Sequence, residues 1–475
     1  MFDFGWSGDG SALTTMILSG SEQFKVRLLV LLGIALVGML FMLTEVGELA
    51  GYVLQGRGFT APREFKQVHL PAIDRSSFVS PNRSHFHALS LEEYPKIYFV
   101  DPGPQFNEQL RQQVSSLLHP QYFTEYVLRD ILKASAFAVD NAEEADLFFV
   151  DAYIASMSRL PEVEKRMTSD KKQFMEAYCQ QLFDALFNSS TWTRYNGRDH
   201  MIIKVSPWPT CFSAATERGI SWIQLASNEF GYPKLKKVGS WDEAVRHVTI
   251  PYYSPPLFTN TQSWRPAFGV QRRYHLCFYG TVNRFLPRKQ FQQELEHLLA
   301  RQPELAGRVI FETMTHREFN DTAMIDMYSQ SVLCPIFPGD SPHSRRLFTT
   351  MLLGCVPVLF SDHIQVPFAS RLDWSSFVFD FAQASLQEEA PSSVVEYLFQ
   401  IPQTEISAKQ KALDAVRHHF AYHETGIEPG DAVDMILADL SDRARLLKQW
   451  NRNQPHQQRF RNQQTLQLLK VKANS

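Results

Sequence analysis

Residues 331–372 read SVLCPIFPGDSPHSRRLFTTMLLGCVPVLFSDHIQVPFASRL, and they indicate the fold most clearly. The stretch begins with an apolar run at 332–337, typical of a buried strand, which ends in a polar Pro/Gly loop. Apolar residues at helical spacing then occupy 345–353, and a second apolar run follows at 356–360. A strand, a loop, a helix and a strand in this order predict a parallel sheet covered by helices.

The loop at 338–343 and the start of the predicted helix carry residues suited to an anion. Ser344 can cap the helix, and Arg345 and Arg346 lie in its first turn. Cations are poor partners for the positive end of a helix, so two arginines there are expected where an anion binds. Open α/β sheets bind ligands at the carboxyl ends of their strands, which suits a diphosphate here. The alternative is an arginine pair that forms salt bridges with surface acids.

The same alternation extends to both sides of this stretch. Nearby, it predicts strands at 274–279 and 308–312 and helices at 287–301 and 322–331. An earlier set has predicted strands at 96–100, 146–150, 200–205, 222–226 and 247–251, and helices at 107–118, 122–137 and 171–187. The sequence therefore predicts two α/β units in series, joined near 262–273.

Composition limits the classes of protein to which the chain can belong. Its 475 residues are 44% hydrophobic, which is enough for a large core and excludes wholesale disorder. The length allows about three domains or two large ones. Because the formal net charge is -3, no charge excess points to nucleic acid as a partner. The five cysteines show no CxxC pair and no zinc-type spacing, so at most two disulfides form and one thiol stays free.

An apolar run near the N-terminus predicts a membrane anchor. The segment 24–44 is long enough to cross a bilayer, and Lys25 and Arg27 at its start keep residues 1–23 in the cytoplasm. Residues 45–90 then read as a stem in the lumen. A cleaved signal peptide and a buried core helix are the alternative interpretations of this run.

Three Asn-x-Ser/Thr sequons follow the predicted anchor, at Asn82, Asn188 and Asn320. They are expected glycosylation sites if the body lies in the lumen, where disulfides are also tolerated. Residues 441–475 are basic and rich in Gln and Asn, and we expect them to form a solvated tail.

The central stretch resembles a known family. GDSPHSRRLF at 339–348, GCVPVLFSD at 354–362 and VPF at 366–368 are similar to the exostosin family, glycosyltransferase family 47. Further pieces in the expected order are YPKIYFVD, EEADLFFV, NGRDH, VTIPYY and CFYGTVNRFLPR. The resemblance covers residues 94–425, and its specific part is 331–368.

This resemblance implies a GT-B fold, in which two Rossmann-like domains face each other across a cleft. Residues 91–265 would bind the acceptor glycan, and residues 266–440 would bind the nucleotide sugar, usually a UDP-sugar. Such enzymes are typically inverting type II membrane proteins of the Golgi that need no metal. The chain contains no Asp-x-Asp, the metal-binding motif of the other common transferase fold, so we expect neither metal nor cofactor. Arginines and helix N-termini would neutralise the donor diphosphate instead.

The resemblance also carries donor-binding roles onto particular positions. Gly280 matches the glycine that closes the first strand of the donor domain, and Arg284 or Arg288 matches the arginine that follows it. The donor loop and the helix start are matched by Gly339, Asp340, Ser344, Arg345 and Arg346. Cys355 and Pro357 match the next strand and are expected to be structural.

Two positions depart from the family pattern. Thr349 stands where many members carry an acidic residue that could bind the ribose, and its hydroxyl can hydrogen-bond only without charge assistance. The NGRDH segment is followed by VSPWPT at 205–210, where plant-type members often have His-Asp-x-Gly. Both departures leave open a chain without catalytic activity.

An inverting transfer requires a general base for the acceptor hydroxyl and positive charge on the leaving diphosphate. The base is expected at a strand end of the first α/β unit. The candidates are Asp101 after the first strand, Asp151 after the second, and Asp199 or His200 in the NGRDH segment. Each has an ordinary alternative, since loop carboxylates cap helices and a lone histidine is more often structural.

Three functions are consistent with the sequence. The first is a Golgi glycosyltransferase that acts on a polysaccharide or glycoprotein glycan, alone or in a homo- or hetero-oligomer with another transferase. The second is a non-catalytic exostosin-like subunit that binds glycan or stabilises a partner transferase. The third is a lumenal sugar-nucleotide hydrolase or another α/β enzyme. Nucleotide-sugar turnover separates the first from the second, and release of free sugar identifies the third.

Overall fold

The computed structural model describes the chain from residue 91. The described residues are 91–114, 122–160, 163, 165, 168–194, 197–205, 221–225, 247–255, 266–282, 285–313, 320–339, 342–362, 364–386 and 393–453. The chain divides into two compact units, 1–60 and 61–475, and every described residue belongs to the second. The predicted anchor, the predicted stem and Asn82 lie outside the described residues. None of the described helices is both long and apolar enough to cross a membrane.

The first α/β unit is built on a six-stranded parallel sheet in the order β2-β1-β3-β4-β5-β6. The strands are β1 Ile97–Val100, β2 Ala138–Val139, β3 Leu147–Val150, β4 His200–Lys204, β5 Ser221–Leu225 and β6 His247–Ile250. All the predicted strands of this unit are present, because continuous apolar runs such as LFFV at 147–150 are buried on both faces. The two-residue strand β2 was not predicted.

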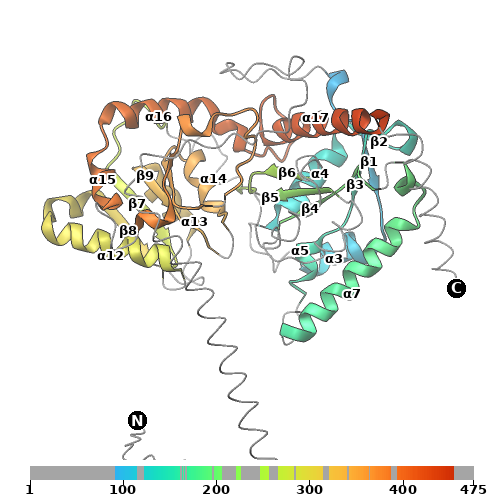
Figure 1. Ribbon diagram of the computed structural model, residues 1–475, viewed down its shortest axis with the longest axis horizontal. Coiled ribbons are helices and arrows are strands. Elements are labelled where there is room, and N and C mark those ends of the chain that lie inside the picture. Colours follow the sequence, from blue (N-terminus) through green and yellow to red (C-terminus); the bar gives the residue numbers. More distant parts are fainter. Residues whose placement is uncertain are drawn as a thin grey trace, which may run out of the picture. The chain divides into compact units, whose positions relative to one another are not determined.

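Helices cover both faces of this sheet. They are α3 Glu108–Val114, α4 Thr124–Ala134, α5 Ile154–Met157 and α7 Thr168–Phe187. α4 buries Leu128, Ile131 and Leu132, the spacing that its sequence predicts for one apolar face. Figure 1 shows α4 and α7 on opposite sides of the sheet. Short 3-10 turns lie at Leu91–Glu93, Pro104–Phe106, Ala142–Glu144, Ser190–Thr193, Pro303–Arg308, Trp374–Ser376, Gln383–Leu386 and Arg417–Phe420.

The second unit is built on a five-stranded parallel sheet in the order β11-β10-β9-β7-β8. Its strands are β7 Tyr274–Gly280, β8 Val309–Thr313, β9 Ser331–Ile336, β10 Val356–Leu359 and β11 Phe379–Asp380, and its first helices are α12 Leu286–Arg301, α13 Asp321–Ser329 and α14 Arg345–Leu352. The elements predicted between 274 and 360 are all present, with bounds that differ by at most two residues. The predicted α/β class is confirmed.

The C-terminal region returns to the first sheet. α15 Val394–Gln400 contacts α12, α16 Gln403–Val416 contacts β10, and α17 Ala432–Asn453 contacts α4 and β6 (Figure 1). The prediction of a solvated tail from residue 441 was therefore wrong for 441–447, where side chains of α17 are buried. Leu440, Ala444 and Leu447 continue a buried apolar stripe at helical spacing past the predicted boundary.

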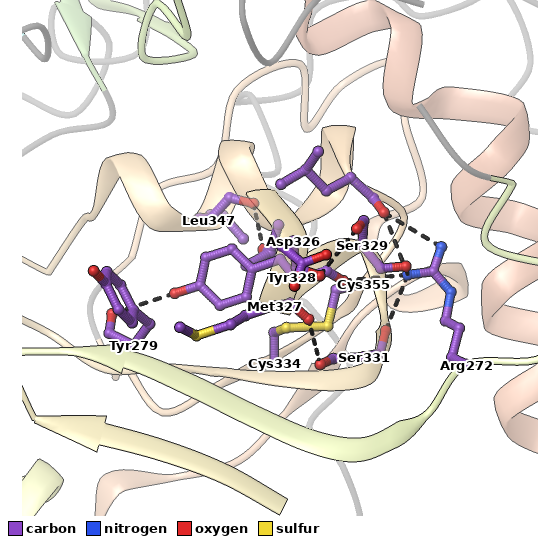
Figure 2. The surroundings of a disulfide bond; sticks show 12 residues. Arg272, Tyr279, Asp326, Met327, Tyr328, Ser329, Ser331, Cys334, Leu347 and Cys355 are labelled. Carbon is purple, nitrogen blue, oxygen red and sulfur yellow. Dashed lines mark hydrogen bonds between the residues drawn. A yellow bond between two sulfur atoms is a disulfide. The ribbon is translucent and has the colours of Figure 1, made fainter. Parts of the chain in front are cut away.

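A disulfide lies in the core of the second unit. Cys334 of β9 is bonded to Cys355, which directly precedes β10 (Figure 2). Cys277 of β7 is a buried free thiol in the same apolar cluster, and Cys179 is also disulfide-bonded. These states agree with the prediction that at most two disulfides leave one thiol free.

Candidate active site

Three neighbouring strands of the second sheet end in polar loops. β7 ends at Gly280, β9 leads into Pro338 and Gly339, and β10 leads into Ser361. Because these strands are parallel and adjacent in the order β10-β9-β7, their loops meet at one edge of the sheet. Ser361 Oγ donates a 2.9 Å hydrogen bond to the carbonyl of Pro342, which joins the β10 loop to the segment before α14.

α14 begins at this edge. Ser344 is its N-cap, and Ser344 Oγ accepts a 3.2 Å hydrogen bond from the backbone N–H of Arg346, so the predicted cap is confirmed. Arg345 is buried and pairs with Asp321 at the start of α13, with 3.4 Å between Nη2 and Oδ1. Burial lowers the pKa of the Arg345 guanidinium, and Asp321 opposes this shift. The salt-bridge alternative thus applies to Arg345.

Arg346 lies against the end of β7. Its Nε donates a 3.1 Å hydrogen bond to the carbonyl of Tyr279, and its guanidinium carbon lies 4.8 Å from the ring centroid of Phe278. Nη1 is buried and has no hydrogen-bond partner among the described residues. A buried donor without a partner is costly, so this atom is suited to a ligand oxygen.

Arg288 in the first turn of α12 joins two loops. Nη1 donates a 2.6 Å hydrogen bond to the carbonyl of Thr281, and Nη2 donates one of 3.1 Å to the carbonyl of Pro338. The guanidinium carbon lies 4.2 Å from the ring centroid of Phe285, and the residue is 6% exposed. Arg288 therefore spans the loops that follow β7 and β9.

The remaining predicted donor residues are distributed as follows. Gly280 and Gly339 lie at the same edge as Arg288 and Arg346, whereas Arg284 and Asp340 lie outside the described residues. Thr349 is buried inside α14, where its Oγ1 donates a 3.2 Å hydrogen bond to the carbonyl of Arg345.

Two candidate bases lie at the carboxyl ends of strands in the first sheet. Asp101 follows β1 and is exposed, and its Oδ1 accepts 2.8 Å hydrogen bonds from the backbone N–H of Gly103 and from Asn107 Nδ2. Asp151 follows β3 and is 3% exposed. Both of its carboxylate oxygens accept hydrogen bonds from Arg129, with Oδ1 at 3.0 Å from Nε and Oδ2 at 2.6 Å from Nη2.

The other two candidates lie at the opposite end of the sheet. Asp199 and His200 stand at the amino end of β4, and both are fully buried. Asp199 Oδ2 accepts a 2.9 Å hydrogen bond from Arg194, and Oδ1 lies 2.9 Å from His200 Nδ1. His200 Nε2 lies 3.1 Å from Thr191 Oγ1, so the pair is enclosed by polar partners.

Sequence reasoning missed two buried titratable groups. Burial raises the pKa of Glu125 in α4 to about 8, against opposing hydrogen bonds from Ser156 and Ala155. Burial lowers the pKa of Lys204, the last residue of β4, to about 8. A signal was available for Glu125, because it precedes Leu128 by three positions and so lies on the apolar face of its helix.

Two of the predicted glycosylation sites are described, and both are exposed. Asn188 follows α7, and Asn320 is the N-cap of α13, where its Oδ1 accepts hydrogen bonds from the backbone N–H groups of Thr322 and Ala323. Within the described ranges, no group of three or more His, Cys, Asp or Glu residues could hold a metal ion.

Comparison with known proteins identifies the family. The Exostosin GT47 domain profile matches residues 92–398, more than half of the chain. The chain belongs to the exostosin GT47 family of glycosyltransferases. The resemblance predicted from the central stretch is confirmed, and the enzyme class with it.

Several curated plant proteins are similar to this chain. The probable arabinosyltransferase ARAD1 of Arabidopsis thaliana is 28% identical over 65% of this chain and 64% of its own length, so the chain spans slightly less than two thirds of that relative. A probable glucuronoxylan glucuronosyltransferase of the same plant is 24% identical over 73% of this chain and 72% of its own. The probable beta-1,4-xylosyltransferase IRX10, also of this plant, is 24% identical over 74% and 84%.

Solved structures give a weaker likeness. A UDP-GlcNAc 2-epimerase from Neisseria meningitidis and the glycotransferase of kitacinnamycin each match with a TM-score of 0.31, at 8% and 12% identity over 73% and 74% of this chain and 99% of their own.

Proposed function

We propose that this protein transfers a sugar from a nucleotide sugar, in the first instance a UDP-sugar, to a glycan acceptor with inversion and without a metal. The proposal includes a GT-B arrangement in which the two α/β units face a cleft. One observation carries it: the family match at 92–398 contains the strand edge where Gly280, Arg346 and the start of α14 meet.

The donor diphosphate would bind at this edge. The N-terminus of α14 offers backbone N–H groups and partial positive charge, and Arg346 Nη1 offers a donor that the described residues leave without a hydrogen bond. These groups would stabilise the charge that develops on the leaving diphosphate. Which sugar the donor carries is left to the experiment, because the relatives are named for arabinosyl, glucuronosyl and xylosyl transfer.

Asp101 is the general base in this proposal. It lies at a carboxyl strand end and is exposed, and its Oδ2 has no partner among the described residues. Asp151 is less suited because Arg129 occupies both of its oxygens.

Asp101→Asn should lower kcat by about 10²- to 10⁴-fold with little change in UDP affinity. Loss of UDP affinity in this variant, or unchanged turnover, would argue against the assignment.

Calorimetry with the full chain tests the donor site. UDP, GDP and a panel of UDP-sugars would be titrated without divalent metal into wild type and into Arg346→Met. Arg301→Met is the matched control, because Arg301 is an exposed arginine at the far end of α12. We expect UDP binding that is lost in Arg346→Met and kept in the control.

The other outcomes point elsewhere. UDP binding without sugar transfer to any acceptor would favour the non-catalytic subunit, and release of free sugar would favour the hydrolase. Absence of binding by every nucleotide to folded protein would overturn the donor site.

We also propose a Golgi location with the body in the lumen and a single N-terminal anchor. The exposed sequons Asn188 and Asn320 support this, because both are accessible for glycosylation. Glycosidase treatment of the expressed chain should shift its gel mobility, and this shift should be smaller in Asn188→Gln and in Asn320→Asp. The second change retains the Oδ1 that caps α13. An unglycosylated chain in a secretory cell would contradict this topology.

A further inference from the structure

Two glycines of the candidate active site each lie against an arginine from the other strand–helix unit. Gly280 closes β7, and a Cβ on it would lie 2.2 Å from Nη2 of Arg346, which belongs to the helix after β9. Gly339 follows β9, and a Cβ on it would lie 3.2 Å from Nη2 of Arg288, which belongs to the helix after β7. Neither glycine has a positive φ, so the backbone conformation does not require glycine at either position.

Each of the two arginines also donates a hydrogen bond to the backbone of the other strand–helix unit. Arg346 donates to the carbonyl of Tyr279 in β7, at 3.1 Å. Arg288 donates to the carbonyl of Pro338 after β9, also at 3.1 Å, while its other terminal nitrogen holds Thr281. Each guanidinium therefore binds backbone of the other strand–helix unit. The guanidinium of Arg346 occupies the space that a Cβ at Gly280 would need, whereas a Cβ at Gly339 would press on the guanidinium of Arg288.

Aromatic rings cover both guanidinium groups. Phe278 lies 4.8 Å from the guanidinium carbon of Arg346, and Phe285 lies 4.2 Å from that of Arg288. With 6% of its surface exposed and two loop carbonyls bound, Arg288 is placed to hold protein backbone together. A planar group with donors in fixed directions suits this role better than a flexible ammonium does.

We propose that Gly280, Arg288, Gly339 and Arg346 form a crossed arginine clasp, in which Arg288 and the two glycines are positioning residues that set the spacing between the starts of α12 and α14. The clasp orients Arg346 so that Nη1 faces the donor. Its effect on donor binding rests on the proposed function, whereas the clasp itself is a property of the fold.

A double-mutant cycle tests the clasp. Gly339→Ala, Arg288→Met and the double variant would be compared with wild type, with the UDP dissociation constant and the urea midpoint as measurements. Each single change weakens the hold of Arg288 on the loop after β9, and we expect the dissociation constant to rise about tenfold if about 1.4 kcal/mol of that loss is passed on to the donor site. Because Arg288 Nη2 is the described atom that a Cβ at 339 would approach most closely, a methyl group there acts mainly on Arg288, and the double variant should match Arg288→Met within about twofold.

Two further variants sharpen the test. Arg288→Lys keeps the charge but offers one donor nitrogen in place of the two that reach the carbonyls of Thr281 and Pro338, so it should behave like Arg288→Met. Gly307→Ala is the control, because a Cβ there would meet nothing within 4 Å. The clasp would be refuted if the Arg288→Lys variant bound UDP as wild type does. It would also be refuted if Gly339→Ala raised the UDP dissociation constant by the same factor in the Arg288→Met background as in wild type.

The test separates this inference from the proposed function. If wild type binds no UDP, the donor site fails, and the urea midpoints alone decide the clasp. If Gly339→Ala does not fold, the pair Gly280→Ala and Arg346→Met provides a second cycle. An additive pattern of midpoints in either cycle whose variants fold would overturn the clasp even if UDP binds.

Discussion

Glu125 is a carboxyl group enclosed at the carboxyl edge of the first sheet. Its Oε1 accepts a 3.1 Å hydrogen bond from the backbone N–H of Ser156, and Oε2 accepts one of 3.4 Å from that of Ala155. Since burial raises its pKa from 4.5 to about 8, the folded state binds the proton more tightly than the unfolded state. This contribution to stability is complete below pH 4.5 and is lost as the pH rises to about 8.

Glu125→Gln should remove that pH dependence. Between pH 4.5 and 8.5 the free energy of unfolding of wild type should fall relative to the variant by roughly 4 kcal/mol, because one pKa unit corresponds to about 1.4 kcal/mol. Urea unfolding at a series of pH values measures this difference. Glu108→Gln, at an exposed position of α3, is the control. Parallel pH profiles for wild type and Glu125→Gln would disprove the argument.

Arg272 acts on backbone carbonyls at the amino edge of the second sheet. Figure 2 shows its guanidinium beside the end of α13, where Nη1 donates to the carbonyls of Ser329 at 2.9 Å and Ser331 at 3.1 Å. Nη2 donates to the carbonyl of Pro266 at 2.9 Å and to the carbonyl of Leu353, which directly follows α14, at 3.3 Å. One side chain thus satisfies carbonyls from several elements.

Arg272→Ala should therefore destabilise the fold by about 3 kcal/mol, because it leaves several buried carbonyls without partners. Arg272→Lys should recover little of this, since an ammonium cannot reproduce the planar fork. Thermal and urea unfolding measure both, with the exposed neighbour in Arg273→Ala as the control. Full rescue by lysine would show that charge alone is sufficient.

At the scale of elements, the disulfide encloses the helix that starts at the candidate active site. Cys334 and Cys355 are separated by 21 residues, and α14 lies entirely between them. The joint change Cys334→Ala and Cys355→Ala should cost about 3 kcal/mol on the chain-entropy account of a loop of this length. We expect UDP affinity to fall as well, because the α14 N-terminus is less constrained.

Cys277→Ala is the matched control for the disulfide variant. It removes a buried sulfur from the same cluster without changing the cross-link. Burial raises the pKa of this thiol to about 12, so it stays protonated and unreactive near neutral pH. An equal loss of stability in both variants would mean that packing, and not the cross-link, supports α14.

Strand polarity also acts at this scale. Asp101 and Asp151 follow strands, whereas Asp199 and His200 precede the main part of one. In a parallel sheet, these two pairs must lie at opposite edges. The sequence placed all four near strands, but the sheet edge on which each lies depends on where the strand begins, and strand boundaries are the least predictable feature of a sequence.

At the scale of the whole molecule, α17 connects elements that are far apart in the sequence. Asp434 hydrogen-bonds to Tyr94 before β1, and Lys448 pairs with Asp146 before β3. Asp439 and Asp442 on the same helix pair with Arg371, which follows β10. One helix thus binds residues from both α/β units.

Removal of α17 should therefore destabilise both units. A stop after residue 431 should give a chain with a much lower thermal midpoint or none, whereas a stop after 453 retains every described contact of α17 and should leave the midpoint near that of wild type. Circular dichroism on heating measures both. A truncated 1–431 chain that melts like wild type would contradict a structural role for α17.

The alternation of strands and helices follows from the sequence, because it depends on local spacing. Apolar runs such as 147–150 and 332–337 can be buried only inside a sheet, and Pro/Gly loops mark their ends. The family segment at 339–348 likewise identifies itself without a structure, and the cap Ser344 is a local feature. These properties required no knowledge of what lies far away in the chain.

The contacts of individual side chains did require the folded chain. Arg345, Arg346 and Arg288 read alike as cations for a phosphate, yet Asp321, Tyr279 and the loop carbonyls of Thr281 and Pro338 separate their roles. The burial of Glu125 and the return of α17 to the first sheet have the same origin. Such partners are brought together by the packing of whole elements, and residues far apart in sequence carry no local pattern that records which of them will meet.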